Sequence, residues 1–95
     1  MGYKIVFKKR YANNLLTVLT YLEKEWGKKA ADEFQDKINS ALTLLSVHPH
    51  LGAYSDKTNL RGLLITKHNR LFYRFRNNTI IVVYLADTRR KSYSH

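Results

Sequence analysis

The sequence has no cysteine, and its 95 residues include one proline, four glycines and seven acidic residues. Without cysteine there is no disulfide framework, thiolate nucleophile or cysteine-ligated metal, which fits a reducing compartment. No apolar run approaches the roughly twenty residues that a membrane-spanning helix needs, and the N-terminal residues lack the layout of a signal peptide. The length suits one small domain, residues 1–95. These absences together predict a small cytoplasmic domain.

Positive charge is what the chain has in excess. Lysine and arginine number 17 against 7 acids, a formal net charge of +10. Residues 61–95 hold eight of these cations and a single acid, Asp87. Such a basic half indicates an acidic partner, which is a nucleic acid, an acidic protein segment or both. A membrane surface is not favoured, because the cations lie on predicted strands and not on an amphipathic helix.

Three apolar runs, rich in β-branched and aromatic residues, dominate the C-terminal half. They predict strands at about Leu60–Lys67, Arg70–Arg76 and Thr79–Leu85. The dipeptides between them, His68-Asn69 and Asn77-Asn78, are typical of tight two-residue turns. The three strands therefore form an antiparallel meander.

Side-chain alternation then assigns the residues of the meander to two faces. One face mixes cations with apolar residues: Arg61, Lys67, Arg70, Arg74, Arg76, Leu63, Ile65, Phe72, Ile81, Val83 and Leu85. The other is apolar and is the expected core face: Leu60, Leu64, Leu71, Tyr73, Phe75, Ile80, Val82 and Tyr84. The mixed face is either an ordinary solvated surface or one that an anionic, partly apolar partner covers. A slip of one residue at either turn would move side chains to the opposite face.

The N-terminal half predicts one strand and two helices. Residues Tyr3–Lys8 alternate as a strand, which we place beside the apolar strand Thr79–Leu85. Helices follow at about Arg10–Glu25 and Lys28–Val47, joined at Gly27, and a loop spans residues 48–59. The apolar stripes of the helices are Tyr11, Leu15, Val18, Leu19, Leu22 and Trp26, and then Ala31, Phe34, Ile38, Ala41, Leu42 and Leu45. The order β-α-α-β-β-β predicts a two-layer α+β domain, with the helical hairpin packed on one face of a small, mainly antiparallel sheet.

Few known catalytic motifs are compatible with this sequence. It has no Gly-rich phosphate loop, no HExxH and no G-x-S-x-G. His48 and His50 lack a third ligand in register, so neither a metal nor another cofactor is predicted. The remaining Arg, Lys, His and Tyr residues suit phosphate binding, or RNA cleavage without a metal. His68 and Tyr93 are the candidates for proton transfer, although a solvent-exposed turn explains His68 slightly better.

The order of these elements and several motifs resemble a known family. The chain is similar to the RelE/ParE toxins of bacterial type II toxin–antitoxin systems. The similar segments are HPHLG, LRGLLI, NRLFYRF and IIVVYL followed by DTRR. The most specific piece is R-x-x-Y-R at Arg70, Tyr73 and Arg74, and the resemblance covers nearly the whole chain. RelE-like members are ribosome-dependent mRNA endonucleases (mRNA interferases) that use basic residues and a C-terminal tyrosine. ParE-like members inhibit DNA gyrase and are not known as nucleases.

The resemblance also implies roles for particular residues. Arg70 matches the arginine that opens the family's third strand, Arg90 a basic residue after the last strand, and Tyr93 lies near the C-terminal tyrosine. RelE-like nucleases carry two alternating lysines on the preceding strand, where this chain has Arg61 and Leu63.

Three hypotheses follow. The first, slightly favoured by the dense arginine cluster, is a toxin that cleaves mRNA on the ribosome without a metal. Its candidate catalytic residues are Arg70, Arg90, His68 and Tyr93, and its nucleic-acid or target-binding residues are Arg61, Lys67, Arg74, Arg76, Arg89 and Lys91. The second is a gyrase inhibitor without catalytic activity, and the third is a non-toxic interaction module of the same fold. In each case the resemblance implies an acidic antitoxin that folds onto the mixed face, with Leu63, Ile65, Phe72, Ile81 and Val83 as its expected contacts.

Overall fold

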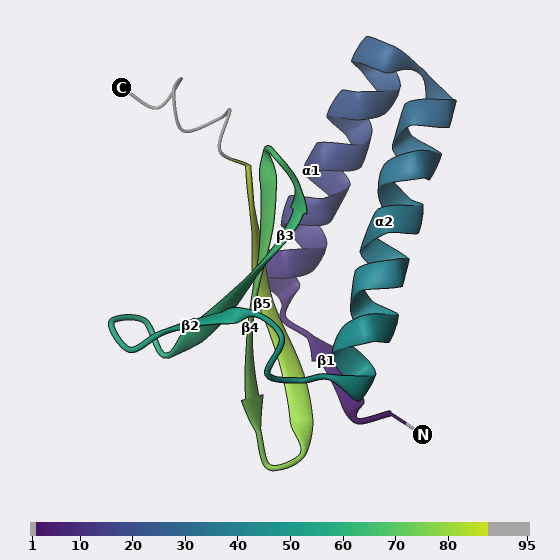
Figure 1. Ribbon diagram of the computed structural model, residues 1–95. Coiled ribbons are helices and arrows are strands. Elements are labelled where there is room, and N and C mark those ends of the chain that lie inside the picture. The colour runs from purple at the N-terminus through teal and green to yellow at the C-terminus, as the bar shows by residue number, and fades with distance from the viewer. Residues whose placement is uncertain (1, 88–95) are drawn as a thin grey trace.

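A computed structural model describes residues 2–87 of the chain. The elements are β1 (Lys4–Phe7), α1 (Lys9–Trp26), α2 (Lys28–Val47), β2 (Ala53–Ser55), β3 (Leu60–Thr66), β4 (Asn69–Arg76) and β5 (Thr79–Asp87). The two helices lie side by side on one face of a five-stranded sheet of order β1-β5-β4-β3-β2 (Figure 1). Strand β1 runs parallel to β5, and the other neighbours are antiparallel. The predicted two-layer α+β architecture is confirmed, as is the place of the first strand beside the last.

Gly27 joins the two helices as predicted. Its φ is +94°, which a residue with a Cβ rarely adopts. Its N–H donates to the carbonyl oxygen of Glu23 at 3.0 Å, which closes α1. Its own carbonyl oxygen accepts from the N–H of Ala30, which opens α2. None of the helices in the part of the chain that the structure describes is long and apolar enough to cross a membrane.

The core lies between the helices and the sheet. Its buried residues are Tyr11, Val18, Phe34, Ile38 and Leu45 from the helices, and Leu71, Tyr73, Ile80, Val82 and Leu85 from the sheet. The predicted helical stripes supply the helical half of this core, with one exception. Trp26, the last residue of α1, is 70% exposed, because α1 ends there beyond the edge of the core.

The pairing of β3 with β4 corrects one part of the prediction. The turn is Lys67-His68, one residue earlier than predicted, and an irregularity follows between Leu64 and Thr66. Arg61 therefore lies opposite Tyr73 and not opposite Arg76. Because the irregularity inserts one residue, the face assignment of β3 reverses.

The reversal moves individual side chains of β3. Leu63 and Ile65 pack against the core, so their assignment to the mixed face is wrong, as is that of Arg61. Leu64, predicted in the core, is 54% exposed. Leu60 is buried as predicted.

The pairing of β4 with β5 confirms the predicted register near the turn and corrects it farther on. Asn77 and Asn78 both have left-handed φ angles, of 53° and 57°, as a two-residue hairpin turn requires. The register shifts by one residue after Tyr73, where Val83 is the extra residue on β5. Tyr84 therefore faces Phe72 on the uncovered side, and Leu85 is buried in the core. Both residues had been predicted on the opposite faces.

The predicted loop 48–59 contains one further element. Strand β2 pairs with the start of β3 in antiparallel fashion, with Tyr54 opposite Arg61. It has three residues, all exposed, so no apolar alternation marks it in the sequence.

Candidate functional site

The face of the sheet that points away from the helices is called the outer face here. On β4 it carries Arg70, Phe72 and Arg74, which alternate with the buried Leu71 and Tyr73. Neither described helix covers it (Figure 1). The predicted mixture of cations and apolar residues is therefore present on β4 and β5, although β3 does not contribute its cation.

A row of stacked side chains crosses the outer face. The ring of Phe72 stacks on that of Tyr84, with centroids 4.6 Å apart and planes 16° apart. The guanidinium carbon of Arg10, from the first turn of α1, lies 4.1 Å from the centroid of the Tyr84 ring. Gly62 of β3 lies close to the Phe72 ring, since a Cβ added at Gly62 would be 3.1 Å from Phe72 Cε1. The row fixes a cation from α1 on a face otherwise built by strands, and the sequence analysis did not single out Arg10.

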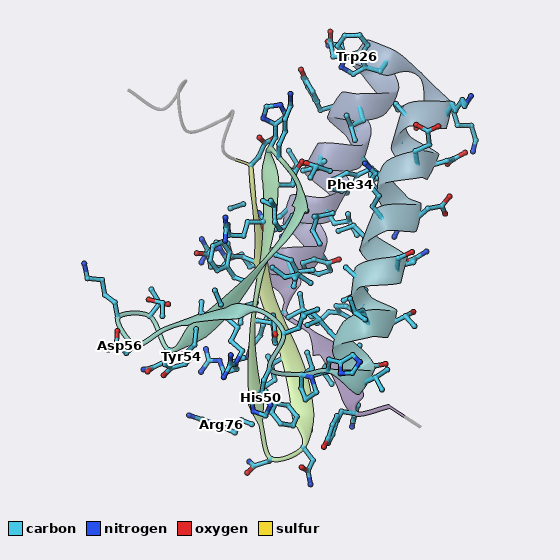
Figure 2. All side chains as sticks on the ribbon, viewed as in Figure 1. Trp26, Phe34, His50, Tyr54, Asp56 and Arg76 are labelled. Carbon is cyan, nitrogen blue, oxygen red and sulfur yellow. The ribbon has the colours of Figure 1, made fainter. Side chains whose placement is uncertain are left out.

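A cleft of about 260 Å³ opens at the C-terminal end of β4. Its polar and charged lining comes from three segments: His50 and Tyr54, Asn59 and Arg61, and Arg74 and Arg76. Phe75 completes the lining. Figure 2 shows His50, Tyr54 and Arg76 together in this part of the molecule, beside the β2–β3 hairpin. The fold thus gathers three of the predicted binding arginines around one cavity.

Backbone carbonyl groups hold Arg61 in the cleft. Its Nη1 donates to the carbonyl oxygen of Gly52 at 2.9 Å and to that of His50 at 3.2 Å. Its guanidinium carbon also lies 5.3 Å from the ring centroid of Tyr54. The Tyr54 hydroxyl in turn donates to Asn59 Oδ1 at 2.8 Å. Both hydrogen bonds to carbonyl oxygens use the same nitrogen of the Arg61 guanidinium group, Nη1.

Tyr73 anchors the loop that carries His50. Its side chain is fully buried, and its hydroxyl bonds to the backbone of Pro49 and of Gly52. Burial raises the pKa of this phenol, and the Gly52 hydrogen bond and the charge of Arg61 partly oppose the rise. His50 itself packs edge-on against Phe75, with ring centroids 5.3 Å apart. One wall of the cleft is therefore rigidly connected to the core.

Arg74 has a buried donor atom that lacks a partner in the described part of the chain. Its Nε is buried and has no hydrogen-bond partner among residues 2–87. A buried donor left without an acceptor costs about 1–3 kcal/mol. No carboxylate in the described range forms an ion pair with Arg61, Arg74 or Arg76, and none lines the cleft. The cleft is a concentrated positive site for which residues 2–87 supply no counterion.

The other predicted site residues lie elsewhere. Lys67 and His68 form the turn before β4, at the end of the strand opposite to the cleft, where the N–H of His68 donates to Thr66 Oγ1 at 3.1 Å. Arg70 lies between these two regions, beside Gly62. Four further predicted residues, Arg89, Arg90, Lys91 and Tyr93, fall outside the described residues. Within the described range, the candidate catalytic residues Arg70 and His68 are thus separate from the cleft.

A second surface is apolar and lies on the helical hairpin. Phe7 and Leu16 are 52% and 65% exposed, and they border a groove of about 420 Å³ between the two helices. Leu15, Ile38 and Leu42 line its floor. Sequence periodicity assigns such residues to the core and does not reveal that a groove remains open between them.

Comparisons with known proteins agree with this fold. No curated protein matches the chain. A solved chain of the chromosomal ParDE toxin–antitoxin system from P. aeruginosa superposes with a TM-score of 0.76 at 15% identity, over 90% of this chain and 96% of that one. A chain of the RelBE2 toxin–antitoxin complex from Mycobacterium tuberculosis gives 0.60 at 17% identity, over 92% and 99%. A conserved hypothetical protein from Helicobacter pylori gives 0.54 at 16% identity, over 90% and 93%.

The structural likeness supports the fold only, because these chains are 15–17% identical to this one. The match in sequence supports the family. Residues 5–92, nearly the whole chain, match the family model described as the ParE toxin of the type II toxin–antitoxin system parDE. The chain therefore belongs to the ParE toxin family, within the RelE/ParE superfamily of type II toxin–antitoxin toxins.

Proposed function

We propose that this toxin acts by binding DNA gyrase in the cytoplasm and does not cleave RNA. The observation that supports this choice is the register of β3 against β4. It turns Arg61 and Leu63, which occupy the positions of the paired lysines of RelE-like nucleases, toward the helix side of the sheet. On the outer face, β3 then presents Gly62 and Leu64 beside Arg70. A cluster of cations around Arg70, which RNA cleavage would need, is not assembled by this strand.

The composition of the outer face suits a protein target. It combines arginines with Phe72 and Tyr84, the residue types that are enriched at protein interfaces. The stack with Arg10 orders these side chains before any partner binds. Ordered aromatic and arginine side chains lose less conformational entropy on association than mobile ones.

RNA cleavage is the second candidate, and one observation favours it. Arg10, Arg70 and Arg74 all belong to the uncovered outer face, a pattern that also fits a phosphate backbone. The remaining nuclease candidates, Arg90 and Tyr93, lie outside the described residues. On this hypothesis, Arg70 would bind the scissile phosphate and Tyr93 would transfer the proton.

Pulse labelling in a sensitive bacterial host separates these candidates. The chain and its Arg70→Ala variant are induced, and the synthesis of DNA, RNA and protein is followed separately. Gyrase inhibition predicts that DNA synthesis stops first while translation continues, and that the purified chain blocks supercoiling by gyrase. An immediate stop in translation that Arg70→Ala abolishes would establish RNA cleavage instead. Normal growth with the protein present would favour the non-toxic interaction module.

We also propose an acidic antitoxin as the partner of this chain. The solved neighbours from P. aeruginosa and M. tuberculosis come from toxin–antitoxin systems. Here an apolar groove on the helices, bordered by Phe7 and Leu16, would take a partner's apolar residues, while the basic outer face would attract its acidic ones. Leu16→Glu should weaken the complex with the co-encoded acidic neighbour, whereas Leu44→Glu, at an exposed leucine of α2 outside both the groove and the outer face, should not. Equal affinities for the two variants would contradict a contact in the groove.

A further inference from the structure

We propose that the cleft at the end of β4 is a binding site for the phosphate group of a nucleotide. This assignment goes beyond the proposed function: the cleft shares Arg74 with the outer face, but neither gyrase binding nor RNA cleavage around Arg70 uses Arg61, Arg76 or the aromatic walls of the cleft. Arg61, Arg74 and Arg76 supply the positive charge, and Tyr54, His50 and Phe75 supply ring faces and edges for the nucleoside.

Charge is the first argument. Three guanidinium groups line one cavity, and no described carboxylate lines it or forms an ion pair with them. Like charges without a counterion repel one another. An anion with several acceptor oxygens would therefore stabilise the three guanidinium groups in the cleft. A phosphate group offers three such oxygens, and arginine binds them through two parallel hydrogen bonds.

Preorganisation is the second argument. Arg61 is fixed by the carbonyl oxygens of His50 and Gly52, which engage its Nη1 only. The Nε of Arg74 is buried and lacks an acceptor among the described residues. One arginine is therefore already oriented, and another has a buried Nε donor that the described residues leave without an acceptor. The fixed position of Arg61 lowers the entropic cost of binding, and the unpaired Nε of Arg74 is a cost of the unbound state.

The aromatic side chains in the walls of the cleft indicate which class of ligand it would bind. Phe75 packs edge-on against both His50 and Tyr3, so its ring is held from two sides. Tyr54 is held by its hydrogen bond to Asn59 across the hairpin. Fixed aromatic walls next to a phosphate-binding cluster are the arrangement that stacks a nucleobase. The volume of about 260 Å³ is near the lower limit for ligand pockets, which suits one nucleotide.

The test uses the full chain, made by cell-free synthesis to avoid toxicity. Adenosine monophosphate, adenosine, inorganic phosphate and a 5′-phosphorylated dinucleotide are titrated while NMR shifts are recorded for the backbone of Asn59, the His50 ring and the Arg61 Nε–H. We expect saturable shifts at these groups with the monophosphate and weaker shifts with phosphate alone or with adenosine. If the 5′-phosphorylated dinucleotide binds more tightly than the monophosphate, the natural source of the phosphate is a nucleic-acid end; the reverse order identifies a free nucleotide.

Matched variants separate a built site from diffuse attraction. Arg74→Gln and Arg61→Gln should each raise the dissociation constant by about tenfold or more, as loss of a charge-assisted bond predicts. Lys37→Gln removes one positive charge from α2, outside the cleft, and should change the constant less than about twofold. The proposal is overturned if all three variants weaken binding equally, if inorganic phosphate binds as tightly as the monophosphate, or if no saturable binding occurs. Failure here would leave gyrase inhibition intact, because that activity is measured by supercoiling.

Discussion

The hydroxyl group of Tyr73, at the centre of the sheet, donates a hydrogen bond to the carbonyl oxygen of Pro49 at 2.8 Å. The hydroxyl oxygen of Tyr73 also accepts a hydrogen bond from the N–H of Gly52 at 2.8 Å. One buried side chain thereby fixes the four-residue segment that follows α2 and carries His50 to the cleft. The stability of the core and the shape of the cleft are therefore coupled through this residue.

Removing that hydroxyl is the first prediction. Tyr73→Phe leaves the Pro49 carbonyl and the Gly52 N–H without their partner in a buried environment. We expect the free energy of unfolding to fall by about 1–3 kcal/mol, measured by denaturant titration. Tyr54→Phe, which removes an exposed hydroxyl, is the control and should change stability by less than about 0.5 kcal/mol. Equal effects of the two variants would mean that the Tyr73 bonds contribute no more than a surface contact.

The second prediction concerns Tyr11 and alkaline pH. Its side chain is 3% exposed, its hydroxyl has no partner in the described part of the chain, and burial raises the pKa of the phenol above its ordinary value of 10.0. Between that value and the raised pKa, the unfolded chain releases the proton while the folded chain retains it. Stability therefore falls as pH rises through this window.

The variant Tyr11→Phe removes this contribution. We expect unchanged or slightly higher stability at neutral pH, because a buried donor without a partner is lost. Above about pH 10, the unfolding free energy of the variant should fall less steeply than that of the wild type. Parallel curves for the two proteins over this range would argue against a raised pKa of Tyr11.

The third prediction compares two glycines with different constraints. A Cβ at Gly52 would lie 2.8 Å from Tyr73 Cε1 and 3.0 Å from the carbonyl oxygen of Gly62, so Gly52→Ala forces a shift in the anchor of the loop. We expect it to lower the unfolding free energy by about 1–3 kcal/mol and to weaken ligand binding in the cleft. At Gly27 the space is open and only the φ of +94° is unfavourable. Gly27→Ala should cost about 1–2 kcal/mol without affecting the cleft.

The fourth prediction is a coupling energy between Arg10 and Tyr84. The guanidinium carbon lies 4.1 Å from the ring centroid, and a cation–π contact at an exposed site contributes about 0.5–1 kcal/mol. A double-mutant cycle with Arg10→Gln and Tyr84→Leu should recover this amount from the unfolding free energies. The Arg61–Tyr54 pair, at 5.3 Å, offers a comparison that should give a smaller value. A coupling of zero would mean that the outer-face row is not held by this contact.

The architecture could be predicted because its signals are local. Gly27 ends the first helical pattern, and Asn77-Asn78 is a turn dipeptide with both residues in the left-handed conformation that asparagine tolerates. The 3.6-residue rhythm of the helices then determined which of their residues face the core. Each of these features depends on neighbours within a few positions along the chain.

The face assignment failed where single-residue irregularities occur. The shifts between Leu64 and Thr66 and between Phe72 and Tyr73 each exchange the two faces of a strand, and neither position carries a glycine that would mark a bulge. At the second, the Asn14 side chain accepts a hydrogen bond from the N–H of Leu85 at 3.1 Å. A residue 71 positions away thus takes part in stabilising the irregular strand, and no local pattern reveals it.

The cleft was missed for a related reason. Arg61, Arg74 and Arg76 were all predicted to bind a ligand, but as members of one flat face. Their actual meeting place depends on His50 and Tyr54, which belong to a loop and to a strand too short to give a pattern. The loop is held at the cleft by long-range contacts, among them the hydrogen bonds of Tyr73, which span more than twenty positions.

The parallel pairing of β1 with β5 has a consequence for biosynthesis. Lys4 lies beside Thr79, so the first and the last described strands are neighbours, and β5 sits between β1 and β4. A nascent chain that has made both helices still lacks the strand on which they pack, and its apolar stripes stay exposed until β5 leaves the ribosome. The sheet is therefore completed only after β5 has been synthesised. On the proposal that the antitoxin binds the helical groove, this delay would let an antitoxin already present in the cell bind the helices before β5 completes the sheet.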